Sequence, residues 1–229
     1  MNMIRKAACV KMLTADESEL ALINQYALRP LKTEEVFTFR LAACNNQVDR
    51  EFEHFSDTAL EGLAKLYPGK SVLLDHAWSS TKQTARIYAA SVEAQGEVKQ
   101  LVLRCYMPRL ESNAGVIAAI ESGILRECSV GVAVGSAVCD LCKTELTTGW
   151  CEHRPGKVYG DTLCTVTLDK AVDAYEVSFV AVPAQPDAGT IKSKRYGGPE
   201  EPADPPEDEE KEKLARAMQD QEEKRYGGF

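Results

Sequence analysis

The sequence predicts an α+β domain built on an antiparallel β-sheet or barrel with a few flanking helices, followed by a disordered tail. Short strand patterns outnumber helix patterns, and the sequence shows neither a regular βαβ alternation nor a phosphate-binding glycine loop. The C-terminal segment is too polar to bury a core of its own. We therefore place the folded domain at residues 1–190 and the tail at residues 191–229.

Local patterns place the individual elements. Ser56 has the side chain of a helix N-cap, and the helix after it should stop at Pro68-Gly69. A second helix is expected from Ser112 or Asn113 to Gly123. Strands are expected at residues 36–41, 71–74, 85–92, 98–107, 129–138, 162–168 and 175–182, with Gln95-Gly96 as the turn of one hairpin.

Composition narrows the classes of function. The chain has 229 residues with 27 basic and 35 acidic side chains, and a net charge of −8 is the wrong sign for a general nucleic-acid binder. No run of about 18 apolar residues indicates a membrane span, and the first residues do not resemble a secretory signal. The eight cysteines are therefore expected to be thiols or metal ligands in a reducing cytoplasm.

The tail is acidic and rich in proline. Residues 195–229 contain 11 acidic and 6 basic side chains, a net charge of −5. Near-copies of one motif, Lys194–Pro199 and Lys224–Phe229, bracket the segment. The tail is either a solvated linker or a detachable extension, used for recruitment or removed by self-cleavage.

Three segments carry residues suited to nucleophilic catalysis. His76 ends an apolar strand, where a neutral imidazole can act as a base, although a structural histidine has the same pattern. Ser129 begins a strand of small residues and needs such a base to become a nucleophile. Cys128 competes with it, but neighbours on a strand point to opposite faces, so only one can meet His76. Glu176 heads the last apolar run and is a candidate to orient the histidine.

Together these segments resemble the tailed-phage prohead proteases, serine peptidases that mature capsids and share a fold with the herpesvirus assembly protease. The resemblance spans residues 35–190 and rests on His76, Ser129-Val-Gly131 and, most specifically, Glu176-Val-Ser-Phe-Val-Ala-Val-Pro-Ala-Gln-Pro-Asp-Ala188. Residues 48–52 and 83–87 are similar to the branch from phages of Gram-positive hosts. The family often has Asn-His-Asp where this chain has Asp75-His76-Ala77.

The resemblance implies that Ser129 is the nucleophile and His76 the general base. For the orienting group it favours Glu176, with Asp75 and His153 as alternatives, since the herpesvirus relatives use a second histidine there. It further implies capsid and scaffold proteins as substrates, the chain itself as a further substrate, and a place inside the assembling prohead in the bacterial cytoplasm. A homo-oligomer is left open; no nucleic-acid or membrane partner is expected.

A separate cysteine cluster points to a metal. Cys139, Cys142, Cys151 and His153 form a complete tetrahedral zinc set, although the Cys-x-His spacing is short and unliganded cysteines remain the alternative. Cys164 is a spare ligand. A site with four protein ligands would be structural, so we describe residues 137–160 as a zinc-binding insertion that catalysis does not need.

Three functions follow. The first is a serine endopeptidase that cleaves phage capsid and scaffold proteins. The second is an inactive structural or scaffold component with the same fold. The third is a small zinc-binding interaction module, which requires an exposed partner surface around residues 139–153.

Overall fold

The computed structural model describes residues 12–13 and 15–181, so the predicted tail and the boundary near residue 190 lie outside the described residues. In chain order the main elements are β1 (Met12–Leu13), α1 (Glu17–Ile23), β2 (Val36–Asn45), β3 (Glu53–Phe55), α2 (Asp57–Leu66), β4 (Ser71–Leu74), β5 (Ala85–Gln95), β6 (Val98–Pro108), α3 (Ala114–Glu121), β7 (Cys128–Cys139), β8 (Val158–Tyr159), β9 (Thr162–Leu163) and β10 (Val166–Phe179). Short 3₁₀ helices precede β2, β5 and α3. The α+β prediction is confirmed.

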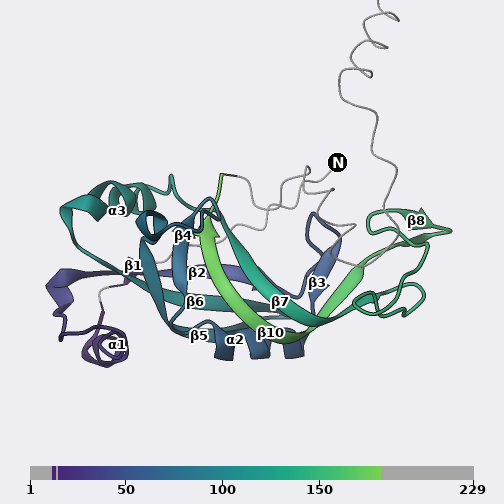
Figure 1. Cartoon of the computed structure of the whole chain (residues 1–229), viewed down its shortest axis with the longest axis horizontal. Helices are drawn as coiled ribbons and strands as arrows, with labels where there is room; N and C mark the ends of the chain where they lie inside the picture. Colours follow the sequence, from purple (N-terminus) through teal and green to yellow (C-terminus); the bar gives the residue numbers. More distant parts are fainter. Residues whose placement is uncertain (1–11, 14, 182–229) are drawn as a thin grey trace, which may run out of the picture. The chain divides into compact units, whose positions relative to one another are not determined.

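One curled sheet of eight strands forms the body of the fold (Figure 1). Its order is β1-β2-β6-β5-β4-β10-β3, and β7 pairs with β10 as well. Most pairs are antiparallel, but β10 runs parallel to both β3 and β4. The sheet is therefore mixed, and the prediction of an antiparallel sheet was wrong. Strands this far apart in sequence can pair in either direction, because long intervening segments connect them.

The strand β10 joins two segments that the sequence pattern separates. Residues 166–179 form one strand of 14 residues, whereas strands were expected at 162–168 and 175–182. Residues 162–163 belong instead to the small β8–β9 hairpin. Polar residues in the middle of β10 obscured its continuity, since Asp169 accepts hydrogen bonds from Ser56 and Thr58 and Asp173 pairs with Lys70.

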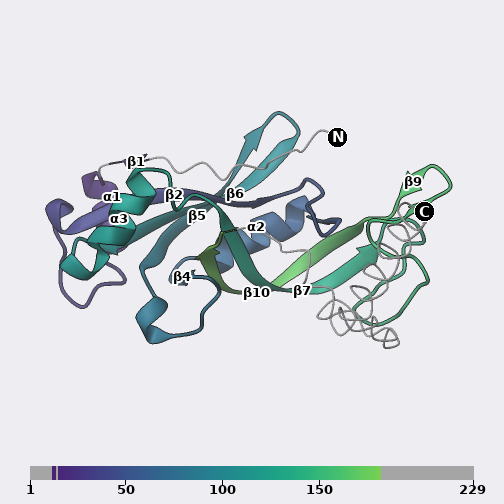
Figure 2. The same ribbon diagram turned by 90° about the horizontal axis from the view of Figure 1, so that it is seen from above.

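The helix α2 begins where its cap predicts. The Ser56 hydroxyl accepts a hydrogen bond from the Ala59 amide at 3.0 Å, as an N-cap does. The helix packs mainly on β10 and β6 (Figure 2). Gly62 allows a close approach, because a Cβ there would lie 2.9 Å from the Ala171 side chain. The helix α1 was not predicted; Asp16 caps it by accepting from the Glu19 amide.

The hydrophobic core determines which side chains of β10 are free for other roles. Val177 and Phe179 belong to the main buried cluster. Because side chains alternate along a strand, Glu176 and Ser178 point to the opposite face, although both are almost fully buried. Among the described residues no helix is both long and apolar enough to cross a membrane.

Candidate functional site

A histidine and a carboxylate meet at the sheet edge where β4 and β10 end. The Nδ1 atom of His76 lies 2.8 Å from Oε1 of Glu176. Glu176 is on β10, whereas His76 follows β4, which pairs with β10 in parallel from Ser71 opposite Glu176 to Leu74 opposite Phe179. The parallel pairing thus brings together two residues 100 positions apart in sequence.

The backbone at His76 has an unusual conformation. Asp75 and His76 have φ angles of 55° and 50°, in the left-handed region that residues other than glycine seldom occupy. The Asp75 amide donates to the Phe179 carbonyl at 2.9 Å, and the Ala77 amide donates to the Leu74 carbonyl at 3.0 Å. Strained residues held by surrounding hydrogen bonds are concentrated at functional sites.

The two partners differ in exposure. The Glu176 side chain is 3% exposed, whereas that of His76 is 41% exposed. The hydrogen bond to Glu176 is the largest of the causes that raise the pKa of His76 above its ordinary value. An ionised carboxylate can only accept, so the neutral imidazole carries its proton on Nδ1 and leaves the lone pair of Nε2 available. This is the tautomer that a general base requires.

Ser129 lies on the neighbouring strand. In the antiparallel β7–β10 pair, Ser129 is opposite Ser178 and Gly131 is opposite Glu176. Residues opposite each other point to the same face, so the Ser129 side chain lies on the face of Glu176. Within residues 15–181 its hydroxyl makes no hydrogen bond, to His76 or to any other side chain. Catalytic hydrogen bonds often tighten only when a substrate is bound.

Gly131 has a steric role beside the carboxylate. A Cβ atom at this position would lie 3.3 Å from the Glu176 Cδ and closer still to Oε1. Only a residue without a side chain leaves room for the carboxylate against the β7 backbone. The sequence motif contains Gly131, but no local pattern indicates this contact.

Cys128 is not available to the site. It points into the core, where it is 7% exposed, and its thiol contacts the Ala42 carbonyl at 3.7 Å. Burial is the main cause that raises its pKa to about 12, so the thiolate is scarce at neutral pH. The prediction that Cys128 and Ser129 point to opposite faces is confirmed.

The structure also separates the three candidates for the orienting group. Glu176 contacts the His76 ring, whereas within the described chain the Asp75 carboxylate forms no hydrogen bond with it. His153 belongs to the cysteine cluster around Cys139, which is opposite Val166 at the other end of β10. Ten residues separate Val166 from Glu176, or about 33 Å along the strand.

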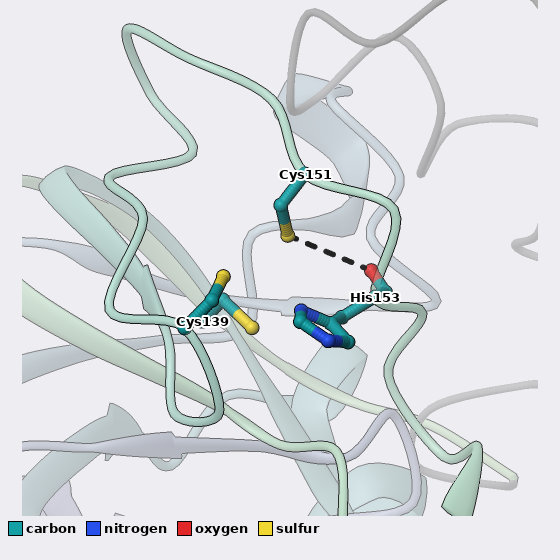
Figure 3. A group of neighbouring side chains, drawn as sticks. Cys139, Cys151 and His153 are labelled. Atoms are coloured by element: carbon teal, nitrogen blue, oxygen red, sulfur yellow. Dashed lines mark hydrogen bonds between the residues drawn. The ribbon is translucent and has the colours of Figure 1, made fainter. Parts of the chain in front are cut away.

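The four predicted metal ligands lie together. One ligand atom from each of Cys139, Cys142, Cys151 and His153 falls within 4.8 Å of the others. Figure 3 shows the Cys139 and Cys151 side chains and the His153 ring converging on one point. A tetrahedral zinc ion brings such atoms to about 3.7 Å from one another, so a small contraction would suffice. The cluster could hold a metal ion.

The state of the individual ligands fits a metal site. The His153 Nδ1 atom is buried and has no hydrogen-bond partner among the described residues. The Cys142 thiol is exposed, and hydrogen bonds, first that with Thr144, lower its pKa to about 6. Burial raises the pKa of Cys151 to about 11. A bound cation would give His153 its missing partner and would hold the thiols as thiolates.

Hydrogen bonds from polar side chains hold the segment between β7 and β10, which carries the candidate metal ligands, against the sheet. Asp140 accepts from the hydroxyls of Thr165 and Thr167 and lies 3.2 Å from Nε2 of His54. Glu145 accepts from the Ser136 hydroxyl and the Ala137 amide. Cys164, the spare ligand, is fully buried. The loop is thus held in place by contacts that do not involve the metal ligands.

In comparisons with known proteins, no family model, no curated protein and no solved structure matches the chain. The site must therefore be interpreted from its own geometry.

Proposed function

We propose that this protein is a serine endopeptidase of the prohead protease kind, which cleaves phage capsid and scaffold proteins. The observation that supports this most is the 2.8 Å contact between His76 and Glu176 on the sheet face that also carries Ser129. A buried carboxylate, a half-exposed imidazole and a hydroxyl on adjacent strands are the three components of a catalytic triad.

Each residue has a defined step in the proposed reaction. His76 Nε2 takes the proton of the Ser129 hydroxyl while the Ser129 oxygen attacks the scissile carbonyl. Glu176 stays ionised and stabilises the imidazolium that forms. His76 then returns the proton to the leaving amine, and water hydrolyses the acyl-enzyme by the same route in reverse.

The family assignment extends the proposal to fold, substrates and place. We assign the curled mixed sheet to the fold of the herpesvirus assembly protease, on the strength of the sequence motifs. The substrates are then the capsid and scaffold proteins of the same phage, and the chain itself, inside the assembling prohead of an infected bacterium.

We propose in addition that Cys139, Cys142, Cys151 and His153 bind one structural zinc ion. Three thiolates and an imidazole are a preferred donor set for zinc. The Nδ1 atom of His153, which is buried and finds no partner within the described part of the chain, supports a ligand role. Because all four positions are filled by protein, the ion would stabilise the loop and would not activate water.

A fluorophosphonate probe tests the peptidase proposal without knowledge of the substrate, since it phosphonylates activated serines. We expect about one equivalent of label on Ser129 of the purified protein, located by mass spectrometry, and none on His76→Ala. Co-expression with the capsid and scaffold genes should show processing that Ser129→Ala abolishes. Absence of both label and processing would instead favour the inactive structural component.

A further inference from the structure

Ser178 is a fully buried serine that contacts both partners of the histidine–carboxylate pair. Its hydroxyl donates to Glu176 Oε2 at 2.5 Å and accepts from the His76 backbone amide at 3.1 Å. It is also opposite Ser129 in the β7–β10 pair. One hydroxyl thus connects the second carboxylate oxygen with the backbone that carries the imidazole.

We infer that Ser178 is a positioning residue of the site: it holds the His76 backbone and the Glu176 carboxylate in the geometry that lets the His76 ring meet Oε1. The inference deepens the proposed function and rests on it for any effect on catalysis. Its structural part, the placement of His76 against Glu176, stands independently of peptidase activity.

The backbone strain at this loop indicates why such a bond is needed. Two consecutive left-handed residues, Asp75 and His76, turn the chain back over β10, and left-handed residues with side chains are unfavourable without compensating contacts. The neighbouring amides of Asp75 and Ala77 bond to main-chain carbonyls. Among the described residues the His76 amide has only the Ser178 hydroxyl as its acceptor, so this side chain completes the set.

The carboxylate is restrained from both sides. Oε1 faces His76 and Oε2 faces Ser178, while Gly131 leaves space on the β7 side. A carboxylate fixed at both oxygens cannot rotate away from the imidazole. Without the hydroxyl, the described residues would leave the Glu176 side chain one hydrogen bond, to the His76 ring. The strained loop that carries this ring would itself have lost the bond to the His76 amide.

Ser178 could stabilise the Glu176 charge without fixing its position, and this role predicts a different pKa of His76 in Ser178→Ala than a positioning role does. Glu176 and Asp75 are the acidic groups that act on the His76 ring. Removing a donor from Glu176 without moving it would leave its negative charge less compensated, and the pKa of His76 would stay constant or rise. Loss of position would weaken the contact, and the pKa would fall towards its ordinary value of 6.5.

The experiment measures the pKa of His76 by NMR titration in Ser178→Ala, with Glu176→Gln as the reference without the charge. We expect Ser178→Ala to lose at least about half of the difference between wild type and Glu176→Gln. Ser136→Ala is the matched control, because Ser136 is a buried serine that also donates to a carboxylate, that of Glu145. Ser136 lies on β7, towards the end of the β7–β10 pair that is far from His76. An unchanged or raised pKa in Ser178→Ala overturns the inference.

A second measurement needs no variant. In the wild-type protein the His76 amide should exchange with solvent at least about tenfold more slowly than the Trp78 amide of the same loop, for which the described residues offer no acceptor. Equal exchange rates at the two amides overturn the inference even if Ser178→Ala does not fold.

Activity distinguishes the inference from the proposed function. If the protein cleaves its substrates, Ser178→Ala should lower kcat by on the order of 10²-fold and leave KM nearly constant, because the residue is buried away from the substrate. If wild type shows no cleavage while the pKa result holds, the peptidase proposal fails and the positioning role of Ser178 remains.

Discussion

Replacement of Gly131 by alanine provides the sharpest test of the site geometry. The new Cβ would lie 3.3 Å from the Glu176 Cδ and overlap Oε1. Ordinary contacts between such atoms are about 3.5–4.0 Å, so the carboxylate must move by roughly 1 Å. The hydrogen bond to His76 starts at 2.8 Å, and a displacement of that size along it would break it.

Two magnitudes follow from this displacement. Misplacement of a catalytic group by about 1 Å costs on the order of 10²-fold in rate, which we expect in the kcat of Gly131→Ala. Overfilling a packed site costs about 1–3 kcal/mol in the free energy of unfolding. The pKa of His76 should fall towards 6.5 because Glu176 is the main cause of its elevation.

The assay combines substrate processing, NMR titration of His76 and urea unfolding. Gly135→Ala is the control, since Gly135 lies on the same strand and its Cβ would meet Val172, an exposed side chain that can rotate away. Gly135→Ala should leave processing and the His76 pKa unchanged. A Gly131→Ala protein that retains both wild-type processing and the wild-type His76 pKa would refute the argument that Glu176 lies against Gly131.

Four further predictions follow. Because the pKa of His76 is raised, kcat/KM should increase with pH through a pKa above 6.5 as the base becomes neutral. The contribution of the His76–Glu176 pair to the free energy of unfolding should be fully present below pH 6.5 and lost as the pH rises through the folded pKa, which urea unfolding across pH measures. Metal analysis should find about one zinc per chain, lost in Cys151→Ala but kept in Cys44→Ala, and chelation should lower the Tm. Cys128→Ala should process substrate as wild type does, because its thiol is in the core; loss of processing in a folded variant would implicate the thiol. Mass spectrometry should show loss of the segment after about Ala188 in wild type but not in Ser129→Ala; an intact C-terminus in both would leave only a recruiting role for the tail.

Local signals in the sequence predicted much of the fold. The Ser56 cap, the hairpin turn near Gln95-Gly96 and the helix before Gly123 depend on neighbouring residues. The structure has all three, although the turn residues are Gly96 and Glu97 because Gln95 still pairs with Val98. The helix α1 was missed because its seven residues carry only a short apolar pattern. The direction in which β4 pairs with β10 has no local signal, since it depends on packing between segments about 100 residues apart.

The two clusters of candidate functional residues differ in the same way. The four candidate metal ligands lie within 15 residues of one another, so their spacing alone predicted the cluster. His76, Ser129 and Glu176 come from three strand segments, and only the resemblance of their motifs joined them. The role of Ser178 was missed, although a serine two residues after Glu176 on a strand must share its face.

The mixed sheet, which the sequence did not predict, explains the strained loop. In a parallel pair the C-terminal ends of both strands lie at the same end of the sheet. His76, which follows β4, therefore lies near the end of β10 that carries Glu176. If β4 continued straight, His76 would lie opposite Ala181, five residues or about 16 Å beyond Glu176. The left-handed conformations of Asp75 and His76 turn the chain back over that distance. The strain is thus the geometric consequence of placing a histidine from a parallel strand onto a carboxylate of its neighbour.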